Sequence, residues 1–60
     1  MTKAEALQLH NEDEVTNKLT GHVCQLIGDP YTVSEDSTLV WVDVQDPEMG
    51  FTTLHNREIS

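Results

Sequence analysis

The chain has 60 residues, of which 37% are hydrophobic, and its 11 acidic side chains against three basic ones give a net charge of −8. A chain of this length forms one domain, residues 1–60, whose core is too small to wall a deep catalytic cleft as well. The negative charge repels phosphates and anionic lipids, so it argues against direct binding of nucleic acid or membranes and favours a basic protein partner. An acidic surface that serves only solubility has the same composition, and both interpretations stay open.

Cys24 is the only cysteine, so no intramolecular disulfide can staple the fold. The residues after Met1 do not lead into an apolar run, so we expect no signal peptide. No stretch approaches the roughly 18 apolar residues that a membrane span needs. These features together predict a cytoplasmic protein.

The first predicted element is a short helix over residues 3–9. Thr2 and Glu5 have the spacing of a capping box, in which each residue's side chain accepts a hydrogen bond from the other's backbone N–H. Ala4 and Leu7 fall on one face of this helix. Residues 10–13 have no apolar periodicity and are expected to form a loop.

Several short strands follow. Residues 14–16 are compatible with one strand, and residues 22–27 form a second, bounded by Gly21 and by the Gly-Asp-Pro sequence at 28–30. Residues 31–33 are expected to continue in an extended conformation. Residues 34–37 form a polar turn.

The strongest strand signal covers residues 38–44, which are β-branched and aromatic. One face of this strand carries Val40, Val42 and Val44 and is predicted to be buried. The opposite face carries Leu39, Trp41 and Asp43.

The rest of the chain predicts a hairpin. Residues 45–50 form its turn, longer than the tight two-residue type, and residues 51–54 form the returning strand. Residues 55–59 are expected to hold a helical turn that leads to a terminal strand. The predicted fold is therefore mainly β, a small α+β domain: an SH3-like five-stranded barrel, or a bent antiparallel sheet, with the short N-terminal helix covering one open end.

The run from Leu7 to Val15, LQLHNEDEV, resembles the Leu-x-Leu-His-Asn-Gly-Asp-Glu-Val opening of small phage and prophage proteins. The strand starts at Gly21 and Gly50 are similar to those of SH3-like and KOW-like barrels. The resemblance implies a compact barrel of mobile-element origin, with a location in the host cytoplasm. Glu12 replaces the glycine of that opening, so a different turn is expected there.

The histidines and the cysteine raise two chemical alternatives. Side chains at positions 22 and 24 of a strand point to one side, and zinc could take four ligands from His10, His22, Cys24 and His55. The spacings are not the tight pairs of structural zinc sites, so we predict no metal and no cofactor, with solvated histidines and a semi-buried Cys24. A nucleophilic role for Cys24 needs an electropositive surrounding, which an acidic domain does not provide. The chain is therefore predicted not to be an enzyme.

Acidic residues form three clusters, which are predicted to be solvated, whereas acid–base catalysis needs one carboxyl in a desolvating pocket. The cluster of Asp43, Asp46 and Glu48 could hold calcium loosely but lacks the spacing and the glycine of an EF-hand loop. Trp41 either faces a partner as an apolar anchor or lies under Ala4 and Leu7 of the helix. The predicted partner-binding residues are Glu12, Asp13, Glu14, Glu35, Asp36, Trp41, Asp43, Asp46 and Glu48.

These observations favour a small acidic binding module, encoded by a phage or another mobile element. It would bind and inhibit or modulate a larger host protein with a basic, nucleic-acid-binding surface, with its carboxylates imitating the phosphates of DNA. The alternative is a structural accessory subunit or a homo-oligomer, such as a homodimer, whose charge serves only solubility.

Overall fold

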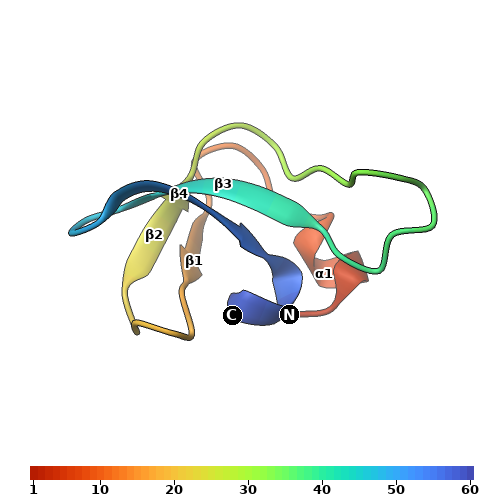
Figure 1. Ribbon diagram of the computed structural model, residues 1–60. Coiled ribbons are helices and arrows are strands. Elements are labelled where there is room, and N and C mark those ends of the chain that lie inside the picture. Colours follow the sequence, from red (N-terminus) through yellow and green to blue (C-terminus); the bar gives the residue numbers. More distant parts are fainter.

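The protein is mainly β, with one short helix before a four-stranded sheet. The computed structural model describes residues 1–60, and its elements follow the chain order expected from the sequence (Figure 1). These elements are α1 (Lys3–Ala6), β1 (Glu14–Thr16), β2 (Val23–Leu26), β3 (Trp41–Asp46), β4 (Gly50–His55) and a 3₁₀ turn, η1 (Asn56–Glu58). No helix has the length and apolar character needed to cross a membrane.

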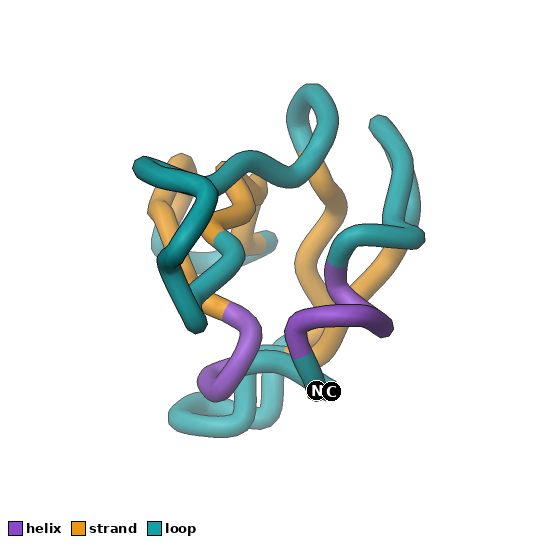
Figure 2. The backbone as a smooth tube through the Cα atoms, turned by 90° about the vertical axis from the view of Figure 1, so that its right-hand side faces the viewer, coloured by secondary structure: helices purple, strands orange, loops and turns teal.

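The sheet is an antiparallel meander in the order β1-β2-β3-β4. The longest pairing joins β3 and β4, in register from Trp41 opposite His55 to Asp46 opposite Gly50. After η1, the last two residues lie along the outer edge of β1, where Thr16 and Ser60 exchange two backbone hydrogen bonds of 3.0 Å. The two termini therefore lie side by side (Figure 2), and the Met1 ammonium donates to the carbonyl of Ile59 at 3.0 Å.

The core lies on the concave face of this sheet. The predicted valine face is confirmed, because Val40, Val42 and Val44 are all fully buried. Val42 and Val44 pack in one cluster with the other core residues, Val15, Cys24, Leu26, Leu54 and Ile59. Met1 and Leu9, on either side of α1, are partly buried and pack against that cluster.

The capping box at the start of α1 is confirmed. The Thr2 hydroxyl accepts from the Glu5 N–H at 3.1 Å, and the Glu5 carboxylate accepts from the Thr2 N–H at 2.9 Å. The helix ends at Ala6 and not at Leu9, because the N–H groups of Gln8 and Leu9 bond carbonyls three residues back, in a tighter 3₁₀ turn.

The face that α1 buries also differs from the prediction. Ala6 is buried, whereas Ala4 is exposed and Leu7 is half exposed, so Ala4 and Leu7 do not form the buried face of this helix. The 3₁₀ turn that follows Ala6 directs Leu9 toward the core in their place.

Two strand predictions need correction. The central strand begins at Trp41 and ends at Asp46, so residues 38–40 belong to the preceding loop. Residues 31–33 do not form a strand, and only Tyr31 pairs, in a single bridge to Trp41. A polar turn at Ser34–Ser37 interrupts the segment, so no further residue reaches β3.

The turn before β1 contains the one residue other than glycine with a positive φ angle, Glu12. Its φ angle is +75°, in the left-handed region that glycine adopts most readily. Its backbone N–H donates to the Leu26 carbonyl at 3.0 Å, which ties the turn to β2.

Candidate functional site

The acidic residues predicted to bind a partner lie in three separate regions of the surface and not in one array. The first group, Glu12, Asp13 and Glu14, spans the turn before β1 and its first residue, and Glu35 and Asp36 lie in the β2–β3 loop. Asp43, Asp46 and Glu48 lie on β3 and in the turn after it. All of these residues except Asp13 and Asp46 are exposed.

Asp46 is buried, which corrects the prediction that its carboxylate is solvated. Only 2% of the residue is exposed. Its Oδ1 accepts hydrogen bonds from the backbone N–H groups of Glu48 at 2.8 Å and Met49 at 3.0 Å, which closes the β3–β4 turn. These two backbone hydrogen bonds lower the pKa of Asp46 to about 2, and the bond from Met49 has the larger effect.

His22 and Cys24 both meet Asp46 on its other side. His22 Nδ1 lies 3.2 Å from Oδ2 of Asp46, and the Cys24 thiol donates to the same oxygen at 3.5 Å. Burial first, and then the hydrogen bond to Asp46, raise the pKa of the Cys24 thiol, so it is held protonated. This polar cluster stabilises the turn and offers no activated nucleophile.

The four residues considered for zinc are not brought together. His55 Nδ1 accepts from the backbone N–H of Arg57, and its ring packs edge-on against Trp41, away from the cluster of His22 and Cys24. No group of three or more His, Cys, Asp or Glu side chains is arranged to hold a metal ion. His22 and His55 are also half-buried, and only His10 is solvated as expected.

Asp13 and Trp41 have structural partners of their own. The Asp13 carboxylate accepts from the backbone N–H of His10 at 2.8 Å and so closes the turn before β1. Trp41 is half-buried, with its ring centroid 5.4 Å from that of His55 at an interplanar angle of 88°. Its backbone pairs with Tyr31, so Trp41 joins the long loop to the sheet.

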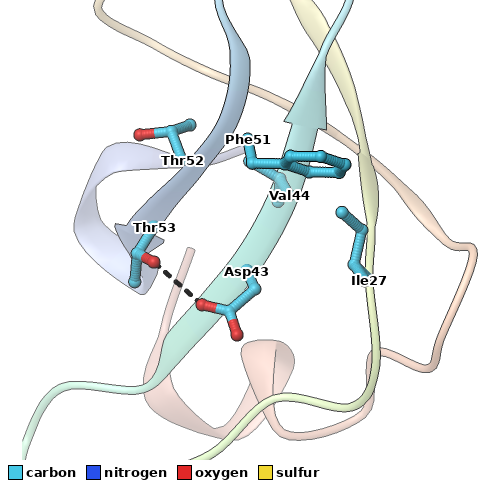
Figure 3. Close-up of a pocket in the computed structure, with 6 residues that line it drawn as sticks. All are labelled: Ile27, Asp43, Val44, Phe51, Thr52 and Thr53. Carbon is cyan, nitrogen blue, oxygen red and sulfur yellow. Dashed lines mark hydrogen bonds between the residues drawn. The ribbon is translucent and has the colours of Figure 1, made fainter.

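The convex face of the sheet holds a pocket of about 320 Å³ (Figure 3). Phe51 on β4 reaches across β3 toward Ile27, which follows β2, and Asp43 lies on β3 between them. Phe51 is 77% exposed and Ile27 is 43% exposed. The pocket lining is Ile27, Asp43, Val44, Phe51, Thr52 and Thr53.

Asp43 is oriented in this pocket through one of its two oxygens. Its Oδ1 accepts from the Thr53 hydroxyl at 2.8 Å and from the Tyr31 hydroxyl at 3.1 Å. Partial burial, followed by the bond to Asp43, raises the pKa of the Tyr31 phenol, which therefore remains a hydrogen-bond donor. Oδ2 accepts no hydrogen bond from the protein, and no Lys, Arg or His forms an ion pair with Asp43.

Phe51, Ile27 and Tyr31 are the site residues that sequence reasoning missed. In the segment Phe51–Leu54, the two apolar residues are three apart, so one must face the core and the other solvent. The alternation of residues within β4 does not show whether Phe51 or Leu54 faces the core. The register with β3 decides it, because Leu54 lies opposite the buried Val42, which leaves Phe51 on the convex face.

The negative charge of the surface is not balanced by basic side chains. The ion pairs within 4.0 Å all involve histidine, namely His22 with Asp46 and Glu48, and His55 with Glu58. No carboxylate pairs with Lys3, Lys18 or Arg57, and the Lys3 ammonium donates to the carbonyl of Ser37 instead.

Comparisons of the chain with family models, with curated proteins and with solved structures found no match.

Proposed function

We propose that this chain is a non-enzymatic binding module that captures a basic surface of a larger protein. The observation that carries the proposal is the set of exposed carboxylates without a Lys or Arg partner, on a chain of net charge −8. Such a field accelerates docking of a positively charged surface and selects against acidic ones. The exposed Phe51 on the same molecule supplies the apolar contact that a purely electrostatic encounter lacks.

The partner class follows from the carboxylates and from the resemblance of the opening residues to phage proteins. Nucleic-acid-binding proteins present basic surfaces shaped for phosphates, which carry one charge per roughly 1.7 Å of duplex axis. The module competes with nucleic acid for such a surface on a host protein and so inhibits or modulates it. Of the predicted acidic residues outside the pocket, five are exposed and close no turn. They are Glu12, Glu14, Glu35, Asp36 and Glu48.

The finer fold assignment is part of the same proposal. The pairing of residues 59 and 60 with the outer edge of β1 supports a fifth, terminal strand. The meander, with this strand added beside β1, is consistent with an SH3-like barrel that the short η1 turn helps to close.

The test uses the native protein and one variant as baits. In the variant, Gln replaces Glu12, Glu14 and Glu35, and Asn replaces Asp36. These amides keep the size of each side chain and remove four negative charges. We expect a basic partner to be retained from host lysate at low salt by the native form only. We also expect its affinity to fall by about tenfold or more between 0.05 and 0.3 M salt, because surface charges are screened. Duplex DNA should compete for the purified partner.

Self-association is the second candidate function, and one feature of β4 favours it. β4 is the last strand of the sheet, and no charged residue or proline lies in its sequence, GFTTLH, to discourage pairing with another strand. Salt distinguishes the two functions, because two copies of charge −8 repel each other. Association of copies through β4 strengthens as salt is added, whereas capture of a basic partner weakens. A partner retained equally by both baits at all salt concentrations would contradict the acidic-capture proposal.

A further inference from the structure

We infer that the pocket on the convex face of the sheet is a receptor for a single arginine side chain of the basic partner. The inference rests on the proposed function and assigns the site at which recognition becomes specific. The pocket combines one uncompensated carboxylate, at Asp43, with an exposed aromatic ring and an aliphatic side chain. These are the groups that an arginine contacts with its charged end and with its apolar stem.

The carboxylate is oriented before any ligand binds. Two hydroxyl groups, of Thr53 on the neighbouring strand and Tyr31 on the adjoining loop, hold Oδ1 from different elements. Oδ2 remains available to accept from a cation. Because the hydroxyls already fix the carboxylate, an incoming guanidinium loses less of its binding free energy to ordering the site.

The apolar residues select arginine over lysine. Phe51 presents an aromatic ring beside Asp43, and a planar guanidinium can stack on that ring while donating to a carboxylate (Figure 3). Ile27 borders the pocket on the other side of β3 and can pack against the methylene groups of the side chain. An ammonium is more strongly hydrated and has no flat face, so it gains less from the same ring.

Charge complementarity identifies the occupant. The basic side chains of this chain lie elsewhere, since none forms an ion pair with Asp43, and the net charge of −8 opposes an acidic ligand or a second copy at this site. The proposed occupant is therefore an arginine from a different, basic protein.

The experiment is a titration of ¹⁵N-labelled protein, followed by NMR, with the blocked tripeptide acetyl-Gly-Arg-Gly-amide. The citrulline tripeptide, which has nearly the same shape and no charge, is the matched ligand control, and the lysine tripeptide tests selectivity. We expect the amide shifts caused by the arginine peptide to cluster at Ile27, Asp43, Phe51 and Thr53. The citrulline peptide should cause no saturable shifts there, and the lysine peptide should bind more weakly than the arginine peptide.

Two variants and one matched control decide the assignment. Asp43→Asn should weaken binding of the arginine peptide by about fivefold, as expected for the loss of one exposed ion pair. Phe51→Ala should weaken it by about threefold through loss of the cation–π contact. Asp36→Asn removes the same charge from a residue outside the pocket lining and should change the affinity by less than about twofold.

The inference is overturned if Asp43→Asn and Asp36→Asn weaken binding equally, or if the arginine peptide shifts amides in all the acidic loops alike. Equal binding of the citrulline and arginine peptides would also overturn it, because the pocket would then be only apolar. The proposed function is tested separately by the bait with four amides, which retains Asp43. If the bait with four amides no longer bound the partner while Asp43→Asn still bound it at full affinity, the proposed function would hold. The pocket at Asp43 would then not be part of the interface.

Discussion

The carboxylate of Asp46 is held by the backbone N–H groups of Glu48 and Met49 and by the side chains of His22 and Cys24. Hydrogen bonds of this kind stabilise the ionised form, which is why the pKa of Asp46 falls from 3.8 to about 2. A carboxylate with a lowered pKa stabilises the folded state fully above its unfolded pKa. That contribution is lost as the pH falls through the folded value.

Asp46→Asn should therefore change how stability depends on pH in acid. Asparagine keeps an acceptor oxygen for the two backbone N–H groups but cannot ionise. At pH 6 we expect the variant to melt at a lower temperature than the native protein. The difference should shrink as the pH is lowered from about 4 to about 2, where Asp46 itself becomes protonated. Thermal melts followed by circular dichroism measure this.

Glu48→Gln is the control for that measurement. Glu48 lies in the same turn but is exposed, and its side chain closes no backbone turn. Between pH 4 and pH 2, the melting temperature of Glu48→Gln should change with pH as that of the native protein does. Melting temperatures of native protein and Asp46→Asn that stay a constant distance apart from pH 6 to 2 would show that the Asp46 charge does not stabilise the fold.

At the scale of elements, β3 makes the clearest division between the two faces of the sheet. Val42 is fully buried in the core cluster, and the adjacent Asp43 is exposed on the convex face. Val42→Asp places a carboxylate in the core without a partner, at a cost of several kcal/mol. That cost is comparable to the whole stability of a small domain, about 5 kcal/mol. We therefore expect this variant to be unfolded at room temperature.

Asp43→Ala is the matched comparison on the same strand. It removes an acceptor from the hydroxyls of Thr53 and Tyr31, and both hydroxyls can bond water at this exposed position. The expected loss of stability is about 1 kcal/mol or less. Equal melting temperatures for the two variants would mean that the facing of β3 is inverted.

The predictable part of the fold is the part that neighbouring residues determine. The capping box of Thr2 and Glu5 and the alternating valines each contain their own evidence, and both are confirmed. The end of α1 depends on where Leu9 meets the core, and the start of β3 depends on the bridge from Tyr31 to Trp41. Such contacts join distant residues, so local pattern placed both boundaries wrongly.

The candidate site followed the same division. Composition identified the exposed acids, but it treated Asp46 as one more solvated carboxylate, although an Asp just before Pro47 in a turn is well placed to bond the following N–H groups. The pocket around Asp43 needed the register of three strands and a bridge from a long loop. No motif in the sequence encodes that meeting of Phe51, Ile27 and Tyr31.

At the scale of the whole molecule, the governing quantity is a net charge of −8 on a molecule that extends 33 × 20 × 16 Å along its principal axes. At about 0.01 M salt the screening length is roughly 30 Å, so each carboxylate interacts with nearly every other one. At about 0.15 M it is roughly 8 Å, and only neighbouring charges interact. Since no Lys or Arg pairs with a carboxylate, salt has few attractive ion pairs to weaken and mainly removes repulsion.

Salt should therefore act on folding and on partner binding with opposite signs. We expect the melting temperature of the free protein to rise between 0.01 and 0.15 M sodium chloride, while the affinity for a basic partner falls over the same range. The bait with Glu12, Glu14, Glu35 and Asp36 as amides has four fewer negative charges, which changes the net charge from −8 to −4. It should melt at a higher temperature than the native protein at low salt and gain less from added salt, because less repulsion remains to be screened. A native protein whose melting temperature falls on adding salt would show that attractive charge pairs hold the fold together. In that case the exposed carboxylates would be structural, and they would not be free to recognise a partner.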